Sequence, residues 1–99
     1  MNIDSFPEPV RTDIYRAIEL LKANGARSVY LFGSVVRDPL PSSVGDIDFA
    51  VAGLPPERFY RAYGAMMMAL SMPFDLVDLD DDSPFIRALR GEGALEQVA

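Results

Sequence analysis

The sequence predicts a single α/β domain over residues 1–99, on the basis of its periodicity, the order of its elements and its length. Three stretches typical of helices alternate with three typical of strands, in the order helix, strand, strand, helix, strand, helix. This order is typical of an α/β protein. The chain has 99 residues, of which 49% are hydrophobic, so it has room for one core and no second domain.

The first predicted helix covers residues 9–24. Pro9 suits its first turn, and Lys22 and Gly25 suit its end. Its apolar residues recur at spacings of three and four and form one stripe: Val10, Ile14, Ala17, Ile18 and Leu21. The polar residues that we expect on its surface are Arg11, Asp13, Arg16 and Glu19.

Three stretches are predicted to be strands. Residues 28–32 (SVYLF) are mostly apolar, β-branched or aromatic, which is typical of a buried strand. Residues 46–52 (DIDFAVA) alternate, so the large apolar side chains point one way while both aspartates and both alanines point the other way. Residues 74–79 (FDLVDL) form the third strand.

Two further helices complete the predicted order. The stretch 57–70 has an inward stripe consisting of Phe59, Ala62, Tyr63, Met66, Ala69 and Leu70, and we also expect Tyr60 to pack. The last helix is predicted to begin after an N-cap at Ser83, with Pro84 in its first turn and Gly91 past its end. We interpret the methionines at 66–68 as core and surface of their helix.

The composition excludes several classes of protein. The chain has no cysteine and no histidine, so it forms no disulfide, and any metal ion must be held by oxygen atoms. A net charge of −6 argues against a protein that binds nucleic acid on its own, because that requires a basic face. No apolar run approaches the roughly 20 residues that a membrane span needs. The N-terminal residues lack the features of a secretory signal, so we expect a cytoplasmic protein.

Two aspartates at the start of the second predicted strand are the first candidates for chemistry. Asp46 and Asp48 share one face of the strand, which Ala50 and Ala52 continue. The small alanines leave room either for a ligand or for a packed helix. Adjacent carboxylates repel each other, and Mg²⁺ relieves this repulsion while taking its other ligands from water and phosphate oxygens. Two such ions about 3.5–4 Å apart would clamp the attacking and leaving oxygens of an in-line displacement.

A pair of metal ions needs a third acidic ligand from a neighbouring strand. The third predicted strand offers Asp75 and Asp78, whose odd separation places them on opposite faces. We favour Asp75, because it is flanked by large apolar residues and would need a cation or a hydrogen-bond donor among them.

Gly33 and Ser34, directly after the first strand, are candidates for binding phosphate. Glycine lets the backbone approach a ligand closely, serine supplies a hydroxyl, and amides that open a short helix could receive phosphate. Arg37 could pair with the same phosphates. Each feature alone has a plainer interpretation, as a turn or a solvated strand edge, and we assign no chemistry to the acidic run 80–82. Their combination in this order nevertheless favours a catalytic site.

This combination resembles the minimal nucleotidyltransferases (MNT), the smallest branch of the DNA-polymerase-β-like nucleotidyltransferase superfamily. The resemblance runs from YLFGS through GDIDFAV and FDLVDLDD to SPFIRALRGEGALEQV. It implies an α+β fold with a small mixed β-sheet flanked by helices. It also implies that Asp46, Asp48 and Asp75 bind two Mg²⁺ ions. Asp75 would further align or deprotonate an attacking hydroxyl, and Gly33 and Ser34 would hold the phosphates of ATP.

Two features depart from the family pattern. The spacer between Ser34 and Asp46 has eleven residues and is longer than usual in the family. Arg37 is followed by Asp38 where the family often has glycine, which places an acid close to the phosphates. Either change would act against nucleotide binding, whereas all three aspartates of the pattern are present.

The resemblance also implies a partner, because family members this short take their acceptor from another chain. That partner is a HEPN-domain protein, often an RNase toxin, in a hetero-oligomer. The chain would be its antitoxin and would transfer AMP from ATP to a tyrosine hydroxyl of the toxin, without direct contact to nucleic acid or membrane. Two alternatives remain open: a non-catalytic antitoxin that neutralises by stoichiometric binding, and the nucleotide-transfer subunit of a small-molecule modifying enzyme.

Overall fold

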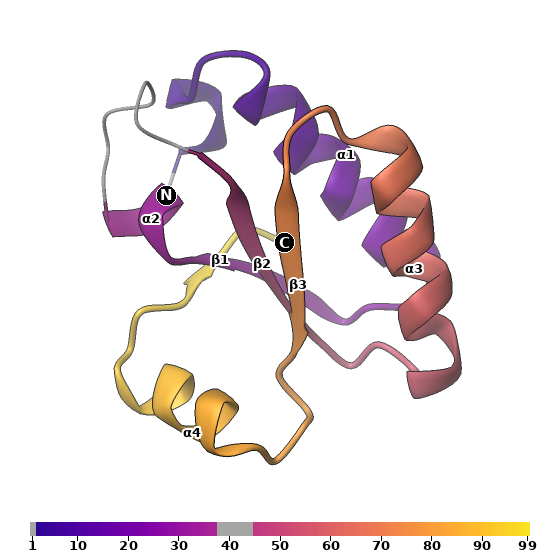
Figure 1. Cartoon of the computed structure of the whole chain (residues 1–99), viewed down its shortest axis with the longest axis vertical. Helices are drawn as coiled ribbons and strands as arrows, with labels where there is room; N and C mark the ends of the chain where they lie inside the picture. The colour runs from indigo at the N-terminus through magenta and orange to yellow at the C-terminus, as the bar shows by residue number, and fades with distance from the viewer. Residues whose placement is uncertain (1, 38–44) are drawn as a thin grey trace.

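The centre of the protein is a four-stranded mixed sheet (Figure 1), seen in a computed structural model that describes residues 2–37 and 45–99. Its strands are β1 (Ser28–Phe32), β2 (Ile47–Ala52), β3 (Phe74–Asp78) and β4 (Glu96–Gln97). They lie in the order β3-β2-β1-β4, with β1 antiparallel to both β2 and β4 and with β2 parallel to β3. The predicted mixed sheet with flanking helices is confirmed. β4 was not predicted, because it is two exposed residues long and carries no alternating pattern.

The three predicted helices and three predicted strands all form, with bounds within one residue of those expected. The helical elements are η1 (Ile3–Ser5), α1 (Val10–Ala23), α2 (Ser34–Arg37), α3 (Pro56–Ala69) and α4 (Pro84–Gly91). The hydroxyl of Ser83 caps α4, as predicted, by accepting a hydrogen bond from the N–H of Ile86 at 3.2 Å. Within the residues described, no helix combines the length and the apolar composition that crossing a membrane requires.

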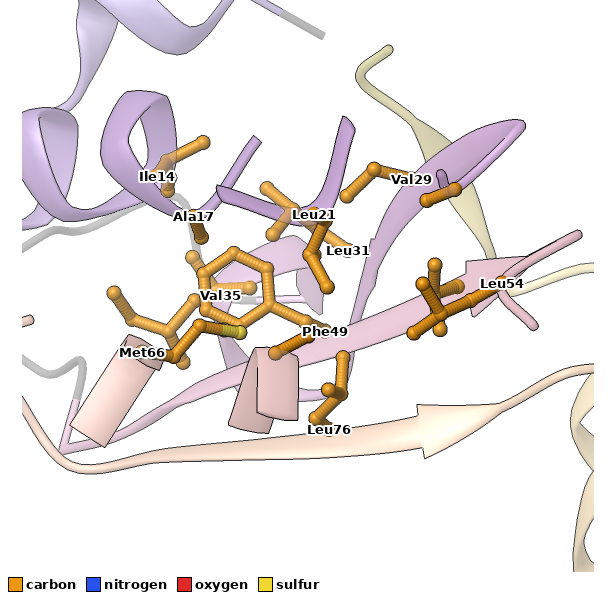
Figure 2. Packing of buried hydrophobic residues seen from close by; sticks show 14 of the residues in the cluster. Ile14, Ala17, Leu21, Val29, Leu31, Val35, Phe49, Leu54, Met66 and Leu76 are labelled. Atoms are coloured by element: carbon orange, nitrogen blue, oxygen red, sulfur yellow. The ribbon is translucent and has the colours of Figure 1, made fainter. Parts of the chain in front are cut away.

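One face of the sheet is covered by α1 and α3 (Figure 1). Phe49 of β2 lies in the middle of this core (Figure 2). Around it pack Ile14, Ala17 and Leu21 from α1, Val29 and Leu31 from β1, Met66 from α3 and Leu76 from β3. The alternation that predicted β2 is therefore confirmed, because its large apolar residues all point into this core.

On the other face of the sheet, α4 covers only part of the length of the strands. Ala50 and Ala52 are buried there against Ile86 and Leu89 of α4. Of the two possibilities for these small residues, the packed helix is the one that the structure shows. The part of this face that Ala50 and Ala52 form is therefore core, whereas Asp48 lies beyond it toward the start of β2.

Two tyrosines on α3 behave differently from each other. Tyr63 packs as expected, with its ring centroid 5.2 Å from that of Phe74. The expectation that Tyr60 packs is wrong, because its side chain is 83% exposed. Its ring contacts that of Phe59 instead, with a centroid distance of 5.5 Å. Met68 is also exposed, which fits the predicted division of the methionine run between core and surface.

Asp13 of α1 is the clearest departure from the sequence analysis, since it is buried and not on the surface. Its carboxylate accepts hydrogen bonds from the N–H (3.1 Å) and hydroxyl (3.2 Å) of Ser71 and from the N–H of Met72 (2.8 Å). These donors belong to the connection between α3 and β3. The next residue, Pro73, accepts from the N–H of Ile47 at 3.1 Å. Asp13 thus holds the segment that aligns the starts of β2 and β3.

Replacing Asp13 with alanine should lower the free energy of unfolding by about 2–4 kcal/mol, because the part-buried donors of Ser71 and Met72 lose a buried, charged acceptor. Urea unfolding followed by circular dichroism measures the change. The matched control is Glu19→Ala, an exposed acid on the same helix, which should cost less than about 0.5 kcal/mol. A loss for Asp13→Ala as small as that of the control would contradict the structural role of this carboxylate.

Candidate functional site

The sheet register places Asp48 and Asp75 next to each other. Because β2 and β3 run parallel, Asp48 pairs directly with Asp75, and on its other side Asp48 pairs with Phe32 of β1. Paired residues in neighbouring strands point to the same face. Phe32, Asp48 and Asp75 therefore form a row across the sheet, on the face that carries α4 further along the strands.

The other two candidate acids lie outside this row. Asp46 is exposed and immediately precedes β2. Asp78 pairs with Val51 on the opposite face, and its carboxylate accepts a hydrogen bond from the N–H of Asp80 at 2.9 Å. The structure thus brings Asp75, and not Asp78, to Asp48. The expected apolar surroundings of Asp75 are absent: its side chain is exposed, because its large sequence neighbours turn toward the other face of the sheet.

Gly33 brings the backbone that follows β1 against Asp48. Its φ of +75° lies in the left-handed region, which favours glycine. A Cβ atom at this position would overlap the carboxylate of Asp48, and it would lie 3.1 Å from the carboxylate carbon. The chain then enters α2 at Ser34, and Val35, only 1% exposed, anchors that short helix in the core. Gly33 and Ser34 are thereby held beside Asp48.

Replacing Gly33 with alanine should cost more stability than replacing Gly93. Both residues have a positive φ, but a Cβ at Gly93 would meet no atom within 4 Å, so Gly93→Ala costs only the backbone strain of about 1–2 kcal/mol. In an Asp48→Ala background the excess cost of Gly33→Ala should vanish, because the overlapping carboxylate is gone. Urea unfolding of the single and double variants measures this coupling. An excess that persists without Asp48 would contradict the close contact.

Burial and neighbouring acids both act on the carboxylate of Asp48. Burial raises the pKa of Asp48 above its usual value of 3.8, the charges of Asp46 and Asp75 raise it further, and Arg37 lowers it. The folded chain therefore binds this proton more readily than the unfolded chain. The stability contributed by protonated Asp48 is fully present below the usual pKa and is lost as the pH rises through the raised value. A bound cation would offset the repulsion that remains at neutral pH.

Whether these residues fit a metal ion depends on the other ligands that the ion brings with it. Across residues 2–37 and 45–99, no three acidic side chains are grouped so as to hold a metal ion by themselves. The donors present are carboxylate oxygens, of which Mg²⁺ usually takes one or two, with water and phosphate oxygens as its other ligands. The candidate residues therefore fit a divalent cation that arrives together with phosphate. Asp38, the acid predicted to lie near that phosphate, falls outside the described residues.

No family model matches the chain, and no curated protein matches it. Several solved structures do match the chain. A toxin–antitoxin structure with AMP-PNP matches with a TM-score of 0.60 at 26% identity, over 87% of this chain and 69% of that chain. A variant of the MntA–HepT toxin–antitoxin matches with a TM-score of 0.61 at 25% identity, over 87% of this chain and 70% of that chain.

The MntA–HepT complex itself matches with a TM-score of 0.59 at 24% identity, over 88% of this chain and 69% of that chain. These matches agree with the resemblance in the sequence, and they include the mixed sheet and the flanking helices. Over most of its length, this chain is a structural match to the MntA antitoxin, an MNT nucleotidyltransferase, at about 25% identity.

Proposed function

We propose that this chain is a Mg²⁺-dependent nucleotidyltransferase that transfers AMP from ATP to a hydroxyl of a HEPN-domain toxin, for which it acts as the antitoxin. The observation that carries the proposal is the pairing of Asp48 with Asp75 directly beside Gly33. The comparisons support it, because one similar structure is a toxin–antitoxin with AMP-PNP and another is the MntA–HepT complex.

Each candidate residue has a role in this proposal. Asp46, Asp48 and Asp75 hold two Mg²⁺ ions, which, when bound, supply the positive charge that stabilises the phosphates during transfer. Gly33 lets the backbone approach the phosphates closely, and Ser34 offers its hydroxyl to them. Arg37, whose charge already acts on Asp48, pairs with the same phosphates.

The reaction is an in-line displacement at the α-phosphorus of ATP. The acceptor oxygen forms a bond to this phosphorus while the bond to the oxygen that bridges toward the β-phosphorus breaks. Pyrophosphate leaves, AMP remains on the acceptor, and the hydroxyl proton passes to Asp75, which aligns the acceptor. Alignment and charge stabilisation supply most of the acceleration. A tyrosine of the toxin is the acceptor that the family resemblance implies.

A second candidate function, a non-catalytic antitoxin that acts by binding, is favoured by one observation. The three acids are not grouped as a complete metal site in the described part of the chain, and Asp46 is exposed. A chain of this kind could neutralise its partner by stoichiometric binding and transfer nothing. The two functions differ in what happens to the mass of the partner.

Asp46→Ala and Asp48→Ala should each lower AMP transfer by about 100-fold or more while the fold persists, because the reacting phosphates lose their charge stabilisation. Intact-mass spectrometry of a co-expressed HEPN-domain partner, after incubation with ATP and Mg²⁺, detects transfer as mass increments of one adenylate. The matched control is Asp82→Ala, an exposed acid outside the site, which should transfer as the unchanged chain does.

Full transfer activity in both site variants would overturn the proposed mechanism. A partner that stays unmodified, but forms a tight equimolar complex with the unchanged chain, would establish the binding-only function. Protection of the partner by Asp46→Ala at equimolar ratio without nucleotide would support that same function, whereas ATP-dependent protection below equimolar ratio would exclude it.

A further inference from the structure

A groove of about 680 Å³ lies between the start of α3 and the connection from β3 to α4. Aromatic and acidic side chains line it together: Phe59, Tyr60, Phe85, Asp78, Asp80 and Asp81. The candidate site does not include any of these residues. The lining of the groove therefore differs in its chemistry from the candidate site.

The aromatic side chains of the groove present rings to solvent. Tyr60 is 83% exposed and Phe85 is 55% exposed. Both are nevertheless held in place, because Tyr60 contacts Phe59 at a centroid distance of 5.5 Å and Phe85 contacts Phe32 at 6.4 Å. Exposed aromatic rings in a concave site offer apolar contact and a negative face to a cation.

Two acidic side chains of the groove accept hydrogen bonds from backbone amides. Asp78 accepts a hydrogen bond from the N–H of Asp80 (2.9 Å), and Asp80 accepts one from the N–H of Gly53 (2.8 Å). These bonds fix the wall of the groove, but a backbone amide neutralises no charge. The basic side chains of α4 that the structure describes act elsewhere: Arg87 faces Asp82 at 3.7 Å, and Arg90 donates to a carbonyl oxygen.

The groove adjoins the row of carboxylates. Val77 lines the groove and lies two residues beyond Asp75 on the same face of β3. Phe85, also in the lining, contacts Phe32, which pairs with Asp48. A peptide segment seated in the groove would therefore lie alongside Asp48 and Asp75.

We propose that this groove binds a segment of the partner protein that carries arginine or lysine beside apolar residues, and that it thereby presents the acceptor hydroxyl to Asp48 and Asp75. The assignment of the segment to the partner rests on the proposed function. Charge complementarity selects a basic occupant, because the groove and the chain, with its net charge of −6, are both acidic. The exposed rings of Tyr60 and Phe85 add cation–π and apolar contact.

The test uses the whole chain, labelled with ¹⁵N, without ATP. The probe is the acetylated and amidated peptide Leu-Arg-Ala-Tyr-Leu-Arg, and the control probe carries glutamate in place of both arginines. The arginine peptide should shift the amide resonances of Tyr60, Asp81 and Phe85, and the glutamate peptide should leave them in place.

Four surface variants locate the binding. Tyr60→Ala and Asp81→Ala should each raise the Kd of the arginine peptide by about two- to fivefold. Their matched controls should leave the Kd unchanged: Met68→Ala, a 90% exposed residue on the same helix, and Asp82→Ala, the acid next in sequence to Asp81. None of the four lies in a core, so loss of folding does not confound the comparison.

Three results would overturn the inference. The first is the absence of shifts in the groove at millimolar peptide, and the second is equal binding of both peptides. The third is movement of the same amides by ATP and Mg²⁺ alone, which would make the groove a nucleotide site. Groove binding without AMP transfer would leave the binding of a basic segment standing, and it would contradict both the proposed function and the presentation of an acceptor hydroxyl. AMP transfer without groove binding would support the proposed function and overturn this inference.

Discussion

The candidate site depends above all on the parallel alignment of β2 and β3. The N–H of Ile47 donates to the carbonyl of Pro73, and this bond sets the register that pairs Asp48 with Asp75. Asp13 of α1 fixes the approach to β3 through its hydrogen bonds to the preceding connection. A shift of one residue in this register would turn Asp75 relative to Asp48 and separate the two carboxylates.

The same alignment places the carboxylates of Asp48 and Asp75 next to each other. Burial and two neighbouring acids raise the pKa of Asp48, and Gly33 places backbone, rather than a side chain, against its carboxylate. The remainder of that face is closed by α4 over Ala50 and Ala52. One end of this sheet face therefore carries the candidate site, while Ala50 and Ala52 belong to the core. Under the proposed function, the partner supplies the acceptor.

Much of this arrangement could be predicted from local patterns. Alternation in residues 46–52 predicts β2 and its faces, and the odd separation of Asp75 and Asp78 predicts that only one of them shares a face with Asp48. The burial of Asp13 could not be predicted with the same certainty, because its hydrogen-bond donors lie 58 residues away. Its spacing of three from Val10 was the available signal, since it places the carboxylate at the edge of the apolar stripe. The cover that α4 provides likewise depends on tertiary packing and not on local pattern.

The decisive measurement is paramagnetic broadening by Mn²⁺, used in place of Mg²⁺ on the ¹⁵N-labelled chain with AMP-PNP, because the broadening locates the cation by distance. If Asp48 and Asp75 hold the cation, broadening should centre on the amides of Gly33, Asp48 and Asp75, and excess Mg²⁺ should reverse it. Broadening centred on the acidic run 80–82, or no broadening that excess Mg²⁺ reverses, would show that these carboxylates do not hold it.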